Sequence, residues 1–450
     1  MERAILVVLL AGLSGVFGNT TSPPPEVNDS EDCLILTPHI YNGEAALARE
    51  LAEVNSSHFL GLKSYSGFIT VNEKYNSNLF FWFFPAATNL TETPLIIWLQ
   101  GGPGFSSMKG LFDIVGPIKV EDGKVVRRNV SWADHSMLFL DNPVGAGFSF
   151  TDDEQGYPDN EDDVGEQMLE FLRQFLEMFP ELRSAPLFVA GESYAGKYVP
   201  ALAIQIHRHN KDKTQDPINM KGIAIGNGLV ELRDMMHYST LCEVLGILEG
   251  NQVDHVAMLE QQVVKLIDSK RMVDAANKFN ETIEYIKKQS GVSVYNFVED
   301  SVSSAPEFEA YITRADVREV IHVGNITFNY NNQLVYEKML PDFANTTKPF
   351  IEELLEHYGV LSYSGQLDVI LAYSLSKHMY GTLQWSQRES YIQAPRRRLR
   401  RFANGSVVGY KKAGGNFVEI LIRRAGHMVP LDQPEVAKFM IDSFIQEFKK

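Results

Sequence analysis

A serine that could act as a nucleophile stands in the hexapeptide Gly-Glu-Ser-Tyr-Ala-Gly at residues 191–196. The hexapeptide follows an apolar run at 186–190 and precedes a segment that can form a helix. On a sharp turn from a strand into a helix, a serine is held in a strained conformation that exposes its hydroxyl at the carboxyl edge of a sheet. Such a turn needs small residues on both sides, and Gly191 and Ala195 meet that need. Ser193 is therefore a candidate nucleophile.

A serine hydroxyl at neutral pH is a poor nucleophile, so it needs a base that is itself oriented by a carboxylate. The sequence offers Asp368 at the end of a predicted strand at 360–364, and His427 in the loop after the last predicted strand. The chain order serine, aspartate, histidine resembles that of α/β hydrolases. We therefore predict a catalytic triad of Ser193, Asp368 and His427.

Each of these residues taken alone is more typical of an ordinary surface loop than of a catalyst. His322 and His378 are the main rival histidines, but neither stands in a context as typical of a catalytic loop. The prediction depends on the three residues occurring together, in the right order and each at the end of a strand.

An acyl-transfer site also needs two backbone N–H groups directed at the oxyanion. One is expected from Tyr194, directly after the nucleophile, and the other from the loop Gln-Gly-Gly-Pro-Gly at 100–104. Paired glycines let the backbone approach a substrate without obstruction by side chains. A plain tight turn is the alternative interpretation of this loop.

The composition is that of a globular protein, because 44% of the 450 residues are hydrophobic and 22% are charged. The chain is long enough for one large domain with an insertion or for two domains. Its net charge of −16 argues against binding to nucleic acid or to an anionic membrane. Two cysteines, Cys33 and Cys242, are as compatible with a disulfide as with thiols. We expect no metal site and no cofactor.

The first 18 residues resemble a secretory signal, with Arg3 before an apolar run at 4–10 that is too short to span a bilayer. Residues 19–30 resemble a disordered leader, and no other run is long enough to span a membrane. Passage through the secretory pathway is also supported by candidate N-glycosylation sites. These are Asn19, Asn28, Asn55, Asn89, Asn129, Asn280, Asn325, Asn345 and Asn404.

Alternating apolar strands and amphipathic helices predict an α/β fold with a mostly parallel central sheet flanked by helices. Continuous apolar runs suited to strands covered on both faces occur at 79–84, 95–99, 137–140, 187–189, 223–225, 360–363 and 417–422. An apolar stripe from Val164 to Phe179 predicts one helix, and Pro434 opens another at the C-terminus.

The pattern changes in the middle of the chain. Residues 239–290 are charged and helical in pattern, and residues 310–345 are predicted to be irregular. We interpret residues 229–350 as a largely helical cap inserted over the edge of the sheet. The hydrolase core then consists of residues 31–228 and 351–450.

Four blocks in order resemble the signature blocks of the serine carboxypeptidase family, from about residue 35 to the C-terminus. They are Trp-Leu-Gln-Gly-Gly-Pro-Gly at 98–104, Asp-Asn-Pro-Val-Gly-Ala-Gly-Phe-Ser at 141–149, Gly-Glu-Ser-Tyr-Ala-Gly-Lys-Tyr-Val-Pro at 191–200 and Gly-His-Met-Val-Pro at 426–430. Gln100 in place of the family's usual asparagine, with residues 194–200 and 321–325, resembles the vitellogenic-like carboxypeptidase branch.

The resemblance implies release of one C-terminal amino acid through an acyl-enzyme, at acidic pH. It assigns the oxyanion hole to the N–H groups of Gly102 and Tyr194. It also assigns binding of the substrate's free carboxylate to Gln100, Gly101 and Glu192. A carboxyl group that donates to a carboxylate must keep its proton, which ties binding to acidic pH.

Two departures from the family pattern are visible. Ile114 stands where the family has a second carboxylate-binding glutamate, with Asp113 adjacent, so weaker discrimination for a free C-terminus or an altered pH dependence is expected. Phe105 stands where many members have a disulfide cysteine. Separately, the basic run at 396–401 is interpreted as a solvated loop or hairpin, with proteolytic processing as the alternative.

Two other functions use the same residues. The triad could serve an esterase or acyltransferase, or the fold could be a catalytically silent secreted glycoprotein that binds a partner. The carboxylate-binding loop favours the peptidase, and the complete triad argues against the silent protein. We expect peptide or protein substrates with a free C-terminus, a monomer or homodimer, and secretion or delivery to the endo-lysosomal compartment.

Overall fold

The computed structural model describes residues 33–300 and 305–450, and the predicted signal and leader lie outside these residues. Its main feature is a ten-stranded sheet in the order β1-β2-β6-β3-β7-β8-β9-β12-β11-β10. The strands are β1 (Tyr65–Asn72), β2 (Ser77–Phe84), β3 (Leu95–Leu99), β6 (Ser136–Leu140), β7 (Leu187–Glu192), β8 (Met220–Gly226), β9 (Gly359–Gly365), β10 (Arg397–Leu399), β11 (Gly409–Gly414) and β12 (Phe417–Ile422). The six strands from β6 to β12 are parallel, and antiparallel strands complete both ends. The predicted α/β fold is confirmed.

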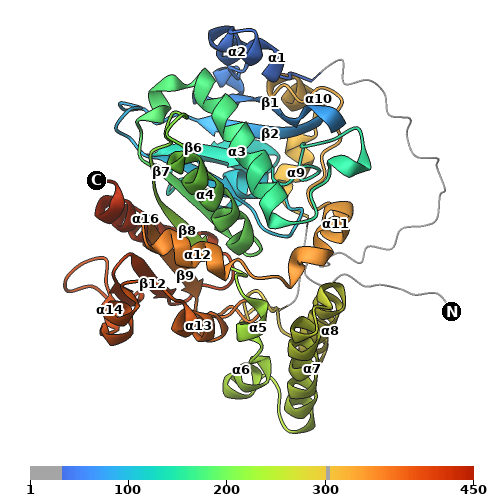
Figure 1. Cartoon of the computed structure of the whole chain (residues 1–450), viewed down its shortest axis with the longest axis vertical. Helices are drawn as coiled ribbons and strands as arrows, with labels where there is room; N and C mark the ends of the chain where they lie inside the picture. Colours follow the sequence, from blue (N-terminus) through green and yellow to red (C-terminus); the bar gives the residue numbers. More distant parts are fainter. Residues whose placement is uncertain (1–32, 301–304) are drawn as a thin grey trace, which may run out of the picture.

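Two apolar clusters cover the two faces of this sheet. Along β3, Leu95, Ile97 and Leu99 belong to one cluster, whereas Ile96 and Trp98 belong to the other. Because side chains alternate between the faces of a strand, this division puts helices α3 (Glu161–Met178) and α4 (Ala195–Lys211) on the first face. Helix α16 (Pro434–Phe448) covers the second face (Figure 1). The continuous apolar strands are therefore explained by burial on both sides.

Helix α3 shows how local sequence sets an element. The Asn160 side chain caps its N-terminus by accepting from the Asp163 N–H at 2.9 Å, and three acidic residues occupy its first turn. Its apolar face carries Phe171 and Phe175 into the sheet. The helix ends before Pro180, which cannot donate a backbone hydrogen bond.

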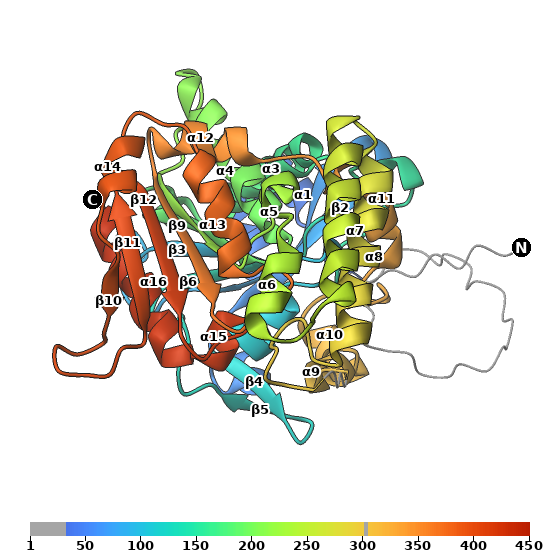
Figure 2. The same ribbon diagram turned by 90° about the horizontal axis from the view of Figure 1, so that it is seen from below.

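Between β8 and β9 the described residues form helices and no sheet strand. They are α5 (Leu232–Met235), α6 (Tyr238–Leu245), α7 (Asn251–Asp268), α8 (Met272–Ser290), α9 (Glu307–Ile312), α10 (Ala315–Val320), α11 (Gln333–Phe343) and α12 (Lys348–Leu355). Helices α7 and α8 pack side by side and project from one end of the molecule (Figures 1 and 2). The boundaries of the cap at 229 and 350 stay a prediction.

The prediction of irregular structure at 310–345 is wrong in part, because α9, α10 and α11 lie there or overlap it. Helices α9 and α10 have only six residues each, too few to show a helical period in the sequence. Helix α11 contains Pro341 and is stabilised by tertiary contacts, including those of Tyr336 with Asn280 and of Phe343 with Tyr194.

The smaller elements lie around this core. They are α1 (Thr37–Tyr41), α2 (Ala45–Leu51), α13 (Tyr373–Thr382), α14 (Arg388–Gln393), α15 (Val429–Asp432) and the hairpin of β4 (Ile118–Glu121) with β5 (Lys124–Arg127). The basic run at 396–401 contains the edge strand β10, which pairs with β11, so it belongs to a hairpin (Figure 2). Whether this hairpin is cleaved stays a prediction.

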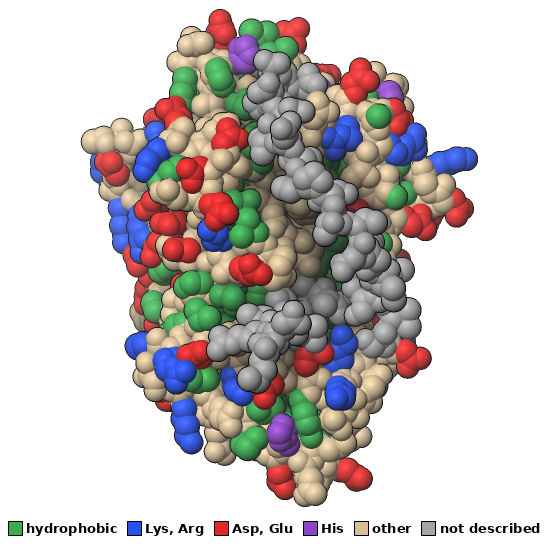
Figure 3. Space-filling model, turned by 90° about the vertical axis from the view of Figure 1, so that its right-hand side faces the viewer, with side chains coloured by type: hydrophobic (Ala, Val, Ile, Leu, Met, Phe, Trp, Pro, Cys, Tyr) green, Lys and Arg blue, Asp and Glu red, His purple; other side chains and the backbone are tan. Residues whose placement is uncertain are grey.

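The surface mixes charges of both signs. Acidic and basic side chains alternate over the described part of the face shown in Figure 3. Among the described residues, no helix is both long and apolar enough to cross a membrane. Cys33 and Cys242 also lie within these residues, and no disulfide bond joins them.

We predict that Phe175→Ala will be strongly destabilising. Phe175 is fully buried, with ring centroids 5.2 Å from Phe83 and 4.8 Å from Phe179. Removing the ring leaves a cavity, so unfolding should become easier by about 3 to 5 kcal/mol. Thermal or urea denaturation checks this, with the exposed Phe402→Ala as the matched control, which should change stability by no more than about 0.5 kcal/mol. Equal stability of the two variants would contradict the assigned core.

Candidate active site

Ser193 lies on a strained turn between β7 and α4. Its φ is +65°, in the left-handed region that non-glycine residues rarely adopt. The turn is held by hydrogen bonds from Ser193 N–H to the Gly226 carbonyl, and from Leu229 N–H to the Ser193 carbonyl, both 3.0 Å. A Cβ added to Gly191 would lie 2.5 Å from the Leu99 carbonyl oxygen, so only glycine fits there. The structure therefore contains the predicted turn, and it requires a small residue at position 191, as predicted.

Asp368 and His427 are brought together from the carboxyl ends of β9 and β12. His427 Nδ1 lies 2.8 Å from Asp368 Oδ2, and both side chains are buried. Burial alone would lower the pKa of His427, but Asp368, together with the smaller effects of Glu192 and Asp432, outweighs burial and the pKa is raised. His427 Nε2 is buried and has no hydrogen-bond partner in the described chain, Ser193 included. It is therefore available to accept a proton.

Asn227 is a residue of this site that the sequence analysis missed. It follows β8 directly and is fully buried. Its Nδ2 donates to Asp368 Oδ2 at 2.6 Å, while its Oδ1 accepts from the Gly365 N–H at 3.1 Å. Asn227 thus fixes the carboxylate that orients His427. The available signal was a polar residue placed directly after a buried strand, at the same sheet edge as the triad.

A distant segment also fixes the histidine. The Tyr295 carbonyl accepts from the His427 N–H at 2.7 Å, and the two rings have centroids 5.1 Å apart. A Cβ on Gly426 would lie 2.4 Å from that carbonyl oxygen, so the loop can approach only because residue 426 is glycine. No sequence pattern connects Tyr295 with His427.

The two expected oxyanion donors lie on either side of the nucleophile. In the described chain, neither the Gly102 N–H nor the Tyr194 N–H donates a hydrogen bond. The backbone of the Gly101 loop lies against the nucleophile turn, because a Cβ on Gly101 would be 2.5 Å from Tyr194 N. Asp141 holds the continuation of this loop through the Ser106 hydroxyl at 2.7 Å and the Ser107 N–H at 2.8 Å.

The predicted carboxylate-binding residues form a buried chain of hydrogen bonds. Trp98 Nε1 donates to Gln100 Oε1 at 3.2 Å, and Gln100 Nε2 donates to Glu192 Oε1 at 2.9 Å. Glu192 Oε2 is buried with no partner in the described chain. Burial raises the pKa of Glu192, and the bond from Gln100 offsets this only in part. Glu192 can therefore hold a proton at higher pH than an exposed glutamate.

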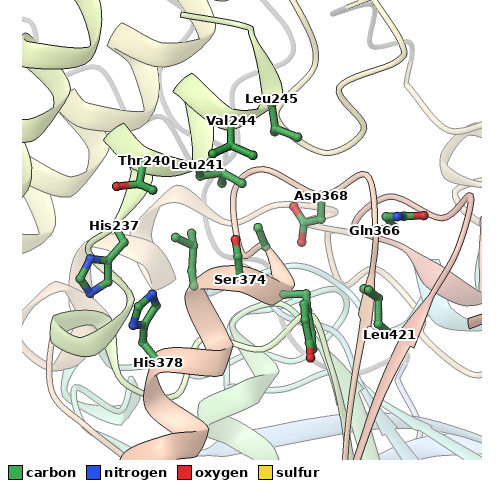
Figure 4. Close-up of a pocket in the computed structure, with 13 residues that line it drawn as sticks. His237, Thr240, Leu241, Val244, Leu245, Gln366, Asp368, Ser374, His378 and Leu421 are labelled. Carbon is green, nitrogen blue, oxygen red and sulfur yellow. The ribbon is translucent and has the colours of Figure 1, made fainter. Parts of the chain in front are cut away.

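The rival histidines lie elsewhere. His322 contacts Ser66, and the His378 ring stacks on His237 with centroids 3.9 Å apart. His237 and His378 line a pocket of about 360 Å³ that includes Asp368 but neither Ser193 nor His427 (Figure 4). The pocket thus lies next to the triad and is separate from the nucleophile.

The candidate glycosylation sites differ in exposure. Among the described ones, the exposed asparagines are Asn55, Asn89, Asn129, Asn325 and Asn404, and Asn345 is half-buried. Asn280 is buried in α8, and its Nδ2 donates to the Tyr336 hydroxyl at 2.6 Å. The folded chain therefore does not favour Asn280 as a glycan acceptor. Asn19 and Asn28 lie outside the described residues.

The parallel sheet, the strained serine turn and the Asp–His pair at strand ends define an α/β hydrolase. The sequence matches the model of the family described as serine carboxypeptidase over residues 55–447. The chain belongs to the serine carboxypeptidase family, and it is a hydrolase that acts as an exopeptidase on peptides.

Relatives along the whole chain agree with this assignment. The venom serine carboxypeptidase of Apis mellifera is 39% identical, covering 99% of this chain and 99% of the relative. The vitellogenic carboxypeptidase of Aedes aegypti is 38% identical, covering 94% of this chain and 92% of the relative. Among solved structures, the prohormone-processing carboxypeptidase Kex1Δp of Saccharomyces cerevisiae shares the fold, with a TM-score of 0.80 at 22% identity over 89% of this chain and 96% of that one.

We predict that Asn227→Leu will reduce catalysis while leaving substrate binding almost unchanged. The substitution removes a buried donor to the Asp368 carboxylate, so kcat should fall about ten- to hundredfold with little change in KM. The surface variant Asn219→Ala, which loses only a bond to the Ser184 carbonyl, is the matched control. Steady-state kinetics of both variants measures this, and an unaltered kcat for Asn227→Leu would show that Asp368 is positioned without it.

Proposed function

We propose that Ser193, Asp368 and His427 form the triad of this carboxypeptidase. The observation that carries the proposal is the buried Asp368–His427 pair, whose Nε2 is unpartnered in the described chain, at the same sheet edge as the strained Ser193 turn. His427 Nε2 takes the Ser193 proton as Oγ attacks the last peptide carbonyl. It then returns that proton to the leaving amine, which departs as the free C-terminal amino acid. Water, deprotonated by the same imidazole, hydrolyses the remaining acyl-enzyme.

The N–H groups of Gly102 and Tyr194 stabilise the oxyanion of both tetrahedral intermediates. Their lack of acceptors within the described residues supports this role. The Asp368 carboxylate remains ionised and stabilises the imidazolium that forms when His427 takes the proton.

Gln100, Gly101 and Glu192 select a free C-terminus in this proposal. Protonated Glu192 donates to the substrate carboxylate, and its buried Oε2 has no other partner in the described chain. Gln100 holds Glu192 in place from the other oxygen. Catalysis then needs Glu192 protonated and His427 neutral. This makes activity bell-shaped in pH, with the acid limb set by His427 and the alkaline limb by Glu192.

The remaining expectations concern context. The signal-like segment and the exposed sequons support secretion or delivery to the endo-lysosomal compartment. Substrates are peptides or proteins with a free C-terminus, and the net charge of −16 argues against nucleic acid or an anionic membrane as a partner. A monomer or homodimer is proposed.

The direct test compares an N-blocked peptide with its C-terminal amide, at about pH 5 and about pH 7.5. Mass spectrometry should show loss of one residue from the free acid only, and Ser193→Ala should abolish it. Cleavage of both peptides would mean a loosened carboxylate site. Cleavage of neither would favour the silent binding protein.

We predict that Glu192→Gln will flatten the pH dependence of KM. In the wild type, Glu192 donates below its raised pKa and loses its proton as pH rises through it, so KM for a free-acid peptide should increase toward alkaline pH. A glutamine amide donates at every pH, so KM should vary less than about twofold between about pH 5 and about pH 7.5. Parallel KM profiles of the wild type and the variant would show that Glu192 does not hold the carboxylate.

A further inference from the structure

Lys109 lies on the segment that follows the oxyanion loop. The next residue, Gly110, begins a turn of π-helix, Gly110–Ile114. Its backbone packs on the Trp98 indole, because a Cβ on Gly110 would lie 2.2 Å from Trp98 Nε1. That same nitrogen donates to Gln100, which in turn donates to Glu192. Lys109 therefore directly precedes the glycine whose backbone packs against this chain of hydrogen bonds.

The charge of Lys109 reaches this site. Its side chain is only 17% exposed and its Nζ lies 3.3 Å from Asp113 Oδ2. The ammonium also acts electrostatically on the Glu192 carboxyl and on the Tyr330 hydroxyl. The Tyr330 hydroxyl is a second hydrogen-bond partner of this ammonium, and three donors leave one for a further acceptor.

The site has a deficit that Lys109 can fill. Glu192 Oε2 is buried and unpartnered in the described chain, and the second carboxyl group that the family resemblance leads one to expect is replaced by the buried Ile114. A free carboxylate bound here would thus meet a single acidic donor. A nearby ammonium group can donate a charge-assisted hydrogen bond to a carboxylate ligand.

We propose that the Lys109 ammonium binds the α-carboxylate of the peptide's C-terminal residue, in place of the missing acid at position 114. This inference rests on the proposed function, and it names the group that retains the substrate carboxylate when Glu192 is ionised. Recognition of a free C-terminus then persists toward neutral pH.

Several charged or titratable groups surround this ammonium and set its field. Asp113 lies on the same turn, Glu192 on β7 and Tyr330 in the loop before α11. Beyond these, the groups that act on Asp113, Glu192 or Tyr330 are Arg128, His427, Asp432 and Glu309. Burial lowers the pKa of Lys109, but Tyr330, Asp113 and Glu192 together outweigh burial and that pKa is raised. Lys109 therefore stays charged throughout the range in which Glu192 and His427 titrate.

The experiment compares Lys109→Met, Lys109→Arg and Asp113→Asn in the full chain. The substrates are N-blocked peptides ending in leucine or in glutamate, and their C-terminal amides serve as competitive inhibitors. At about pH 7.5, Lys109→Met should raise KM for both free acids about tenfold, with kcat within about twofold. The inhibition constants of the amides should not change, and Lys109→Arg should retain most of the affinity.

The Asp113→Asn variant tests whether Lys109 binds the substrate or only forms a structural ion pair with Asp113. It removes the competing carboxylate, so KM for the free acids should stay equal or fall. An increase in KM like that of Lys109→Met would overturn the proposal, since the ion pair itself would then be what matters. An unchanged KM in Lys109→Met, an equal loss of acid and amide binding, or an effect confined to the glutamate peptide would also overturn it. Failure of the proposed function is distinct, because the wild type would then release no C-terminal residue at all.

Discussion

The site depends on one close backbone contact, between the loop at 100–104 and the turn that carries Ser193. A Cβ on Gly101 would lie 2.5 Å from Tyr194 N and 2.6 Å from the Glu192 carbonyl oxygen, so the two chain segments are as close as backbones allow. The neighbouring parallel strands β3 and β7 deliver both segments to the same edge. This contact brings together the proposed nucleophile, the proposed oxyanion donors and the proposed carboxylate-binding residues.

The segment between β8 and β9 contacts two parts of the site. The Tyr295 carbonyl fixes the His427 backbone, and on the other side the Phe343 ring stacks on Tyr194 with centroids 5.4 Å apart. Lys197, buried in α4, donates to the Asp342 carbonyl of α11 at 2.7 Å. The segment between β8 and β9 therefore contacts both His427 and the turn that carries Ser193.

Patterns local in the chain were enough to predict seven of the ten strands of the sheet, all but β1, β10 and β11, and to predict the Asp368–His427 contact. Every predicted strand run lies in an observed strand, because continuous apolar residues and flanking turns are local signals. Asn227 carried only the weak signal of a polar residue after a buried strand. The Tyr295 carbonyl and the position of Lys109 were not predictable, since each acts through a contact between segments distant in sequence. The short helices α9 and α10 were not predicted either, because six residues are too few to show a helical period in the sequence.

Glu192 and His427, the proposed carboxylate-binding acid and the proposed base, are electrically coupled. The Glu192 carboxylate helps to raise the pKa of His427, and the imidazolium in turn lowers that of Glu192. When Glu192 takes a proton, this contribution disappears, so the pKa of His427 falls and the imidazole remains a base to lower pH. In the proposed complex, the substrate carboxylate brings its own negative charge next to protonated Glu192. Glu192 and His427 therefore titrate as a coupled pair, and neither pKa is independent of the other.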